Sequence, residues 1–325
     1  MHDMIATPSM LRGIIPPDPI SELSATEGVL AVITGVEGSA YRAVGSAMAM
    51  LSDGARVGSL SSGCIEEALS IEASNHCTDD KPRHLRYGEG SPWIDIKLPC
   101  GAGLDIGLWP SNRDETLIKS HDLYMRRQSH SMHLPRQELN FHLTEELTPA
   151  GWLGADFVLP RVPPLQFLVA GTGVETVAFV DMARAAGYTV RVISPDSYVQ
   201  SALSDVYGLD TGDLPPGLEP DGQTAVVLFF HGNEHETRLL PSALESSAFW
   251  IGTQGSRKKR RVLQDELKAA GVSSASLERL EESFGVIPSA RDPQTLAVSV
   301  LADVVRAYKA TWFDPYFAQP QKTVP

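Results

Sequence analysis

The chain contains little cysteine: its 325 residues include three thiols, Cys64, Cys77 and Cys100, with no paired spacing. An odd number of cysteines without such spacing excludes a disulfide scaffold and is typical of a reducing compartment. Long apolar runs are also missing. The longest notable one, AVVLFF at residues 225–230, is far shorter than the ~20 residues that a membrane helix requires, and the N-terminus lacks the pattern of a signal peptide. We therefore predict a cytoplasmic protein without a membrane partner.

Positive charge is scarce as well. The sequence has 27 basic and 40 acidic residues and a net charge of −13, which disfavours nucleic acid or an anionic membrane as a partner. A composition of 42% hydrophobic and 21% charged residues excludes a disordered chain, and the length suits about two domains. Five basic residues are nevertheless consecutive, at 257–261, so the positive charge is concentrated at one place.

The first part of the chain, residues 1–160, predicts a β-rich α+β domain. Short β-branched and aromatic segments alternate with turns that contain glycine and proline, and Asp53-Gly54 is typical of a hairpin turn. The predicted strands are 29–36, 47–51, 56–61, 83–88, 93–98, 104–109 and 131–143, and the predicted helices are 64–76 and 113–129. Four histidines lie where this pattern is ambiguous, and we expect them at the surface: His121, His130, His133 and His142.

The second part, residues 161–325, predicts a Rossmann-like domain with a parallel sheet, so the chain as a whole is of the α/β class. The two prolines of RVPP at 161–164 mark the boundary. Beyond them, short and almost wholly apolar strands alternate with helices, which is typical of a parallel sheet covered on both faces. The predicted strands are 165–171, 189–194, 224–230 and 248–253, and the predicted helices are 174–186, 236–245, 256–270 and 292–310.

The first candidate binding motif is Gly171-Thr-Gly173-Val-Glu-Thr176, between a strand and a helix. Its first two glycines allow a tight turn and a close approach of the backbone to a phosphate at the helix N-terminus. Thr176 replaces a third glycine and should hold the helix slightly away from the strand. A dinucleotide site usually has an acid at the tip of the second strand to bind a ribose, and Asp196 lies two residues beyond that position. The motif therefore indicates either a nucleotide site or a turn that only packs.

The second candidate is Gly252-Thr-Gln-Gly255-Ser256-Arg257, followed by the rest of the basic run. Ser256 can cap the next helix while backbone N–H groups and the planar guanidinium of Arg257 face an anion. Cations at a helix N-terminus oppose the helix dipole, which favours a bound anion over a merely solvated first turn. Lys259 lies roughly 200° around the helix from Arg257, so we expect it to turn away from that anion.

Cys64 and Cys100 lie in loops rich in small residues, GSLSSGC and PCGAG. A helix that starts at Cys64 favours its thiolate, whereas the acids at 66 and 67 oppose it. Two thiolates at one site would suit a soft metal; alternatively, each cysteine is a small buried apolar residue. His231 follows the strand 224–230 and should share one edge of the parallel sheet with the two glycine turns.

Five blocks of the sequence, in unchanged order, resemble the XdhC/CoxI family and span nearly the whole chain. GSAYRAVGSAMAMLSDGARVGSLSSGCIEEAL, at 38–69, is similar to the family's N-terminal signature GSxPRxxGxxM…DGxxxGxxxGGCxE. PCGAG, at 99–103, resembles the family's CG-rich loop. The remaining blocks are the Rossmann segment 168–194, the GSR-containing helix start 249–272, and 284–305, which begins FGVIPSARDP.

The resemblance implies an accessory protein of a molybdenum hydroxylase such as xanthine dehydrogenase, and a carrier without turnover of its own. Such a protein binds the molybdenum cofactor, as molybdopterin or its dinucleotide form, protects it during sulfuration by a cysteine desulfurase and delivers it to the apo-enzyme. A homodimer is expected. Carried onto this chain, the cofactor-binding residues are Arg42, Cys64, Glu66, Cys100, Gly171, Gly173, Gly252, Gly255, Ser256 and Arg257, with Cys64 and Cys100 as metal ligands.

The sequence also departs from the family pattern, and two other functions stay open. Val174 stands where many members have histidine, and Ser194 stands where many have an acid. Ser194 argues against NAD, although the glycine motif still permits an NAD(P)-dependent oxidoreductase. The third possibility is a regulatory scaffold whose pockets are vestigial.

Overall fold

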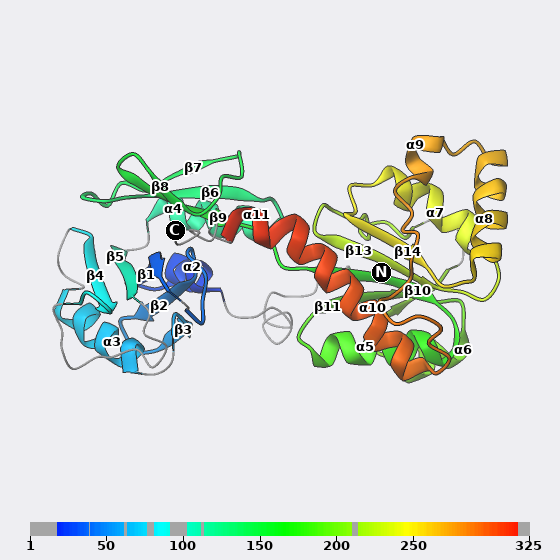
Figure 1. Cartoon of the computed structure of the whole chain (residues 1–325), viewed down its shortest axis with the longest axis horizontal. Coiled ribbons are helices and arrows are strands. Elements are labelled where there is room, and N and C mark those ends of the chain that lie inside the picture. Colours follow the sequence, from blue (N-terminus) through cyan, green and yellow to red (C-terminus); the bar gives the residue numbers. More distant parts are fainter. Residues whose placement is uncertain are drawn as a thin grey trace, which may run out of the picture. The chain divides into compact units, whose positions relative to one another are not determined.

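The structure, a computed structural model, describes residues 18–38, 40–61, 64–76, 81–91, 103–111, 114–209 and 214–317 (Figure 1). The chain divides into two compact units. Of the described residues, 18–163 and 312–317 belong to the first, called the N-terminal unit, and 164–311 belong to the second, called the C-terminal unit. The division into 1–160 and 161–325 did not anticipate that the segment from Trp312 onward groups with the N-terminal unit.

An antiparallel five-stranded sheet forms one half of the N-terminal unit. Its strand order is β3-β2-β1-β5-β4, and the hairpin predicted at Asp53 joins β2 to β3. The Asp53 carboxylate accepts a hydrogen bond from Ala55 N (2.9 Å), and Gly54 takes a φ of +86°. The strands are β1 (Gly28–Glu37), β2 (Ala47–Leu51), β3 (Arg56–Gly58), β4 (Arg83–Gly88) and β5 (Gly103–Ser111). The strand predicted at 93–98 lies outside the described residues.

A second antiparallel sheet, with the order β7-β6-β9-β8, completes the N-terminal unit. Its strands are β6 (His130–Pro135), β7 (His142–Thr144), β8 (Gly151–Leu153) and β9 (Asp156–Arg161). The prediction of surface histidines is wrong for His130 and His133, whose exposed fractions are 1% and 8%. Both residues lie on β6, which has a neighbouring strand on each side. The strand predicted at 131–143 contains most of β6, but the sequence pattern did not show that it would have a neighbour on each side.

One apolar core joins the two sheets to the helices α2 (Pro19–Ala25), α3 (Cys64–His76) and α4 (Glu115–Met125). Trp109 of β5 is fully buried in this core, and its ring N–H donates to the carbonyl of Pro135 on β6 (2.8 Å). Asp18, the N-cap of α2, forms a two-pronged ion pair with Arg161 of β9, at 2.7 and 2.8 Å. Apolar contacts therefore join the two sheets, and the ion pair joins α2 to the second sheet.

The C-terminal unit is built on a parallel five-stranded sheet with the order β12-β11-β10-β13-β14. Alternate residues of β10 enter different cores: Phe167 and Val169 pack in one, and Leu168 and Ala170 in the other. The first core contains α5 and α10, and the second contains α7 and α8. Both faces of the sheet are therefore covered, as the apolar strands predicted, and the Rossmann-like fold is confirmed.

The C-terminal elements include every strand and helix predicted there, together with α6, β12 and α9, which were not predicted. The strands are β10 (Gln166–Gly171), β11 (Thr189–Ile193), β12 (Val206–Tyr207), β13 (Thr224–Phe229) and β14 (Trp250–Thr253). The helices are α5 (Gly173–Ala185), α6 (Ser197–Ala202), α7 (Glu236–Glu245), α8 (Arg257–Ala269), α9 (Ser274–Leu277) and α10 (Pro293–Tyr308), followed by a π-helical turn, η1 (Lys309–Phe313), and α11 (Asp314–Phe317). No helix in the described ranges is both long enough and apolar enough to cross a bilayer.

Candidate functional site

The carboxyl ends of the parallel strands form one edge of the C-terminal sheet. β10 is paired with β11 on one side and with β13 on the other, so the chain order changes direction between β10 and β13. Open α/β sheets bind ligands at such a switch point. Gly171 ends β10, His231 follows β13 and Gly255 follows β14. The two glycine turns and His231 therefore lie on one rim, as the parallel order predicted.

Gly171 is required by close packing. A Cβ atom there would lie 2.4 Å from the Thr176 hydroxyl oxygen and 2.8 Å from the carbonyl oxygen of Phe229. Thr176 is fully buried and donates to the carbonyl of Thr172 (2.9 Å). The hydroxyl of Thr176 thus turns onto the backbone at the start of its own helix. Gly173 is needed for a different reason, its φ of +74°.

Asp196 occupies the anion-binding position of this turn. Its carboxylate accepts a hydrogen bond from Gly173 N (2.9 Å) and another from Tyr198 N (2.9 Å). Ser194 closes the turn from the same side by donating to the carbonyl of Gly171 (2.7 Å). The Gly173 N–H group is one that a dinucleotide phosphate would need. A fixed negative charge already holds it, so the turn is poorly suited to a second anion.

The second turn is arranged differently. Ser256 caps α8 by accepting a hydrogen bond from Lys259 N (3.2 Å), as predicted. Arg257 opens the helix with an exposed side chain, and its guanidinium has no hydrogen-bond or ion-pair partner among the described residues. Gly252 serves packing, because a Cβ atom there would lie 2.2 Å from the ring of Trp250. Of the predicted residues at this turn, Gly255, Ser256 and Arg257 are exposed to solvent.

Lys259 points into the protein, so the basic run is not one uniform exposed patch. Its ammonium donates to the carbonyls of Phe230 (2.6 Å) and Gln254 (2.9 Å) and lies 2.9 Å from the carboxylate of Glu236. Glu236 is fully buried and also accepts a hydrogen bond from Thr253. Burial raises the pKa of Glu236, although the contacts with Thr253 and Lys259 oppose the shift. Lys259 thus fastens the carboxyl ends of β13 and β14.

In the N-terminal unit, three strand ends that border predicted site residues in the sequence lie toward the same end of the five-stranded sheet. Glu37, the end of β1, pairs with Gly103, the start of β5. Residues 38–46, which include Arg42, follow β1 in the chain. Cys100 precedes β5 in the chain. β1 and β3 are both antiparallel to β2, so they run in the same direction. The last residue of β3, Gly58, therefore points toward the sheet end at which β1 ends. The chain then continues to Cys64, the first residue of α3.

Glu66 holds the segment in front of α3. One of its carboxylate oxygens accepts hydrogen bonds from the Ser59 hydroxyl (2.8 Å) and from the amides of Leu60 (3.0 Å) and Ser61 (3.2 Å). Burial alone would raise the pKa of Glu66, but these bonds, together with the charge of Arg56, outweigh it and lower the pKa. The carboxylate is therefore charged, and it orders the backbone just before Cys64.

Arg42 lines a hollow of about 480 Å³ in the N-terminal unit. Tyr41 also lines it and is 74% exposed, and so do Phe313 and Phe317, whose rings are stacked on each other. The guanidinium of Arg42 has no hydrogen-bond or ion-pair partner within the part of the chain that the structure describes. The hollow therefore combines an available cation with aromatic surfaces.

Sequence reasoning missed several of these residues. Phe313 and Phe317 are far from Arg42 along the chain, and no local pattern links them. Asp196 was interpreted only as a misplaced ribose ligand. The predicted thiol ligands lie outside the described side chains: Cys100 is not among the described residues, and of Cys64 only the backbone is described.

Two family models match the chain. The one described as the XdhC Rossmann domain matches residues 167–304, and the one described as the XdhC and CoxI family matches residues 23–88. The first range contains both glycine turns, and the second contains Arg42, Cys64 and Glu66. Cys100 lies outside both matched ranges.

Two curated relatives align with most of the chain. The molybdenum cofactor insertion chaperone PaoD of Escherichia coli (strain K12) is 29% identical over 282 residues, covering 87% of this chain and 84% of PaoD. A protein of Bacillus subtilis (strain 168), named as a probable subunit of xanthine dehydrogenase, is 23% identical over 318 residues, covering 87% of this chain and 94% of that protein. A crystal structure of a protein described as a xanthine dehydrogenase from Bacillus halodurans shares the fold, with a TM-score of 0.67 and 19% identity over 93% of this chain and 98% of that one.

Proposed function

The chain belongs to the XdhC and CoxI family, and on this premise we propose that it is a molybdenum cofactor insertion chaperone for a hydroxylase of the xanthine dehydrogenase type. It holds the cofactor as cargo, keeps it during sulfuration by a cysteine desulfurase and passes it to the apo-enzyme, with no turnover of its own. A cytoplasmic homodimer is part of this proposal. The likeness to PaoD along most of both chains supports the carrier function over catalysis.

The observation that carries the proposal is the hollow of Arg42. Molybdopterin combines a flat ring system with a phosphate. The aromatic wall of Phe313 and Phe317 suits the ring, and the planar guanidinium suits the phosphate through paired hydrogen bonds. In a chain with a net charge of −13, a guanidinium without a counter-ion among the described residues is a specific feature.

In the C-terminal unit, Arg257 is the proposed contact for a phosphate group. It stands at the first residue of α8, where the helix dipole also favours an anion. The Gly171 turn is the weaker candidate for this phosphate, because Asp196 already takes the Gly173 N–H. The same contact disfavours an NAD(P)-dependent oxidoreductase.

The thiols of Cys64 and Cys100 are the proposed soft ligands of molybdenum. Gly103, three residues after Cys100, pairs with Glu37 at the sheet end where the Arg42 segment begins, and β3, which precedes Cys64 in the chain, runs toward the same end. Glu66 acts as a positioning residue in this proposal, because its carboxylate binds the backbone before Cys64 rather than facing a ligand.

The test is cofactor retention after co-expression with the enzymes of molybdenum cofactor synthesis. Molybdenum per chain is measured by mass spectrometry and the pterin by the fluorescence of its oxidised form. Arg42→Ala and Arg257→Ala should each reduce molybdenum content about tenfold, the loss of roughly one charge-assisted contact. Arg126→Ala and Lys268→Ala remove exposed cations elsewhere in the same units and should retain wild-type content.

Two outcomes would contradict the proposal. The wild-type chain could carry no pterin under these conditions, or all four variants could retain it equally. Melting temperatures are measured alongside, so that a loss of binding is separated from a loss of folding. Binding of NADPH with release of a reduced product would instead support the oxidoreductase.

A further inference from the structure

Three side chains with metal-binding atoms lie on one face of the four-stranded sheet, outside the site described above. His133 of β6 is directly opposite His142 of β7 in the antiparallel register. Asp156 of β9 pairs with Pro135, two residues along from His133, and so belongs to the same face. The alternate residues of β6 and β9 enter the apolar core. This face is therefore the outer one, and three strands each contribute one side chain to it.

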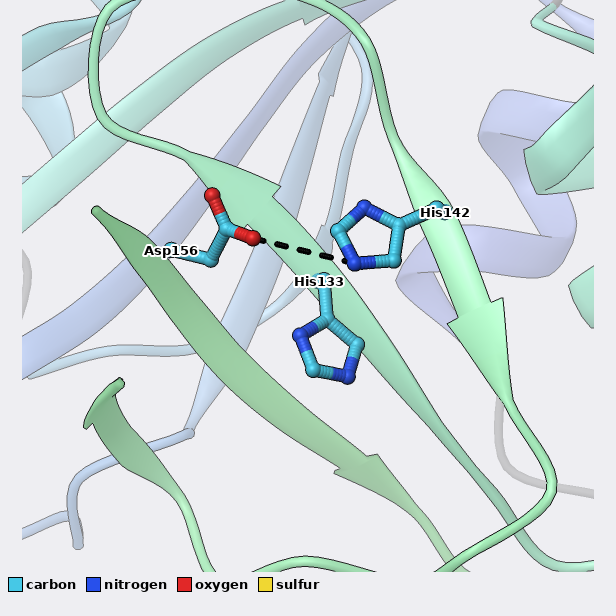
Figure 2. Close-up of side chains that lie close together, drawn as sticks. All are labelled: His133, His142 and Asp156. Atoms are coloured by element: carbon cyan, nitrogen blue, oxygen red, sulfur yellow. Dashed lines mark ion pairs between the residues drawn. The ribbon is translucent and has the colours of Figure 1, made fainter. Parts of the chain in front are cut away.

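The three side chains converge (Figure 2). One ligand atom from each of them lies within 4.8 Å of the other two. Nε2 of His142 is 3.7 Å from a carboxylate oxygen of Asp156, and the two imidazole rings are stacked with their centroids 4.4 Å apart. Nε2 of His133 lies 3.2 Å from the Thr144 hydroxyl, which leaves Nδ1 as the nitrogen available to an ion.

The surroundings protect one side of this cluster and leave the other open. His133 is 8% exposed, although it lies on the outer face, whereas the side chain of His142 is 51% exposed. A hollow of about 430 Å³ is lined by His142 and Asp156, and Glu138 and Asn140 line it as well. An ion held by the cluster would keep an open position toward this hollow.

We propose that His133, His142 and Asp156 bind one divalent transition-metal ion of the zinc class. Two imidazole nitrogens and one carboxylate oxygen form a donor set that suits such ions and not magnesium or calcium. Three protein ligands leave a fourth position for water or for a ligand from another molecule. Ligands of one zinc ion lie about 3.4 Å apart at bond lengths near 2.1 Å, so modest rotations of the side chains bring the three atoms into range.

The position of the cluster indicates what a bound ion would do. β7 is a three-residue edge strand, and its hydrogen bonds to β6 are its only strand pairing within the described residues. A metal ion would fasten β7 to β6 and β9 through side chains. This site is separate from the proposed cofactor function and does not depend on it.

The experiment uses the full chain after treatment with a chelator and gel filtration. Zn²⁺ is titrated by calorimetry, and Co²⁺ is titrated by its visible absorption, which reports the coordination number. We expect one equivalent of each ion to bind, and His142→Ala and Asp156→Asn each to weaken binding about tenfold or more. Glu145→Gln removes a nearby exposed carboxylate and should bind like wild type. Mg²⁺ should not compete.

Thiolates also bind zinc, so the titration is repeated on a Cys64→Ser, Cys77→Ser, Cys100→Ser variant. Retention of one equivalent in this variant, and its loss on further replacement of His142, supports the proposal. The proposal is overturned if the wild-type chain binds no Zn²⁺ or Co²⁺, if binding disappears with the thiols, or if His142→Ala binds as tightly as Glu145→Gln.

Discussion

The carboxylate of Asp196 joins the starts of two helices, because it accepts hydrogen bonds from the amides of Gly173 and Tyr198. Each bond places negative charge at the positive end of a helix dipole. A phosphate at the Gly171 turn would have to displace this carboxylate and would be repelled by it. Glycine spacing alone is therefore insufficient to assign a nucleotide site, since a residue 23 positions away decides whether the amide is free.

Arg257 and Lys259 both lie in the first turn of α8, but their replacement should affect different properties, cofactor retention for Arg257 and stability for Lys259. Lys259→Ala leaves Glu236 buried without its cation, and we expect the free energy of unfolding to fall by about 3–5 kcal/mol. Arg257→Ala should preserve stability and reduce molybdenum retention more than Lys258→Ala does. Urea denaturation followed by circular dichroism measures the first effect. Equal stability of the Lys259 and Lys258 variants would contradict it.

Cys64→Ala should leave the fold intact and weaken retention of the molybdenum cofactor. Cys64 is the first residue of α3, where the helix dipole favours a thiolate. Cys100→Ala is expected to have a smaller effect, because its loop precedes a strand and provides no dipole. Molybdenum content and melting temperature are measured for both variants. If Cys64→Ala matches wild type in both, the thiol has no role in binding.

At the scale of elements, Glu66 links a helix to the segment that precedes it. Glu66→Ala removes the acceptor for two backbone amides and the Ser59 hydroxyl, and should loosen residues 59–61. We expect amide hydrogen exchange there to accelerate about fivefold to thirtyfold, which corresponds to roughly 1–2 kcal/mol of local stability. Glu67→Ala is the matched control, because Glu67 is exposed. Unchanged exchange in the Glu66 variant would show that other contacts hold the segment.

A buried ion pair connects α2 with β9. Asp18 and Arg161 form two hydrogen bonds, and the Arg161 guanidinium lies 4.5 Å from the ring centre of Tyr124. Asp18→Asn removes the partner of a buried cation and should reduce the free energy of unfolding by about 3–5 kcal/mol. Asp122→Asn, which replaces an exposed acid of the same unit, should change it by less than about 0.5 kcal/mol. Chemical denaturation of both variants distinguishes the two cases.

At the scale of the whole molecule, acid should destabilise the chain. Burial lowers the pKa of His130, although its hydrogen bond to the carbonyl of Gln128 opposes the shift. Below the unfolded value of about 6.5, the unfolded chain gains a proton that the folded chain does not, so stability falls as the pH decreases. The slope contributed by this histidine is at most about 1.4 kcal/mol per pH unit.

The measurement compares unfolding at pH 7.5 and pH 5.5 for wild type, His130→Asn and His231→Asn. The His130 variant should lose less stability on acidification than wild type, whatever its stability at pH 7.5. His231 is 71% exposed at its side chain and serves as the control. An identical loss in the His130 and His231 variants would exclude His130 as a source of acid sensitivity.

The sequence by itself determined the class of fold and the longer C-terminal elements, because their signals are local, whereas short elements such as α6, β12 and α9 were not predicted. Asp292 and Pro293 start α10, Gly187 follows the end of α5, and Ser256 caps α8, each through bonds that span no more than four residues. The alternation of wholly apolar strands with helices likewise indicated a parallel sheet with both faces covered. These features depend on neighbours along the chain, so composition and spacing predict them.

Only the tertiary structure decided which distant groups meet. The contact of Asp196 with Gly173, the inward turn of Lys259 onto Glu236, and the wall of Phe313 beside Arg42 each join separate elements. The cluster of His133, His142 and Asp156 depends on the order and register of three strands. No local preference encodes such register, because it is set by how whole sheets bury their apolar faces.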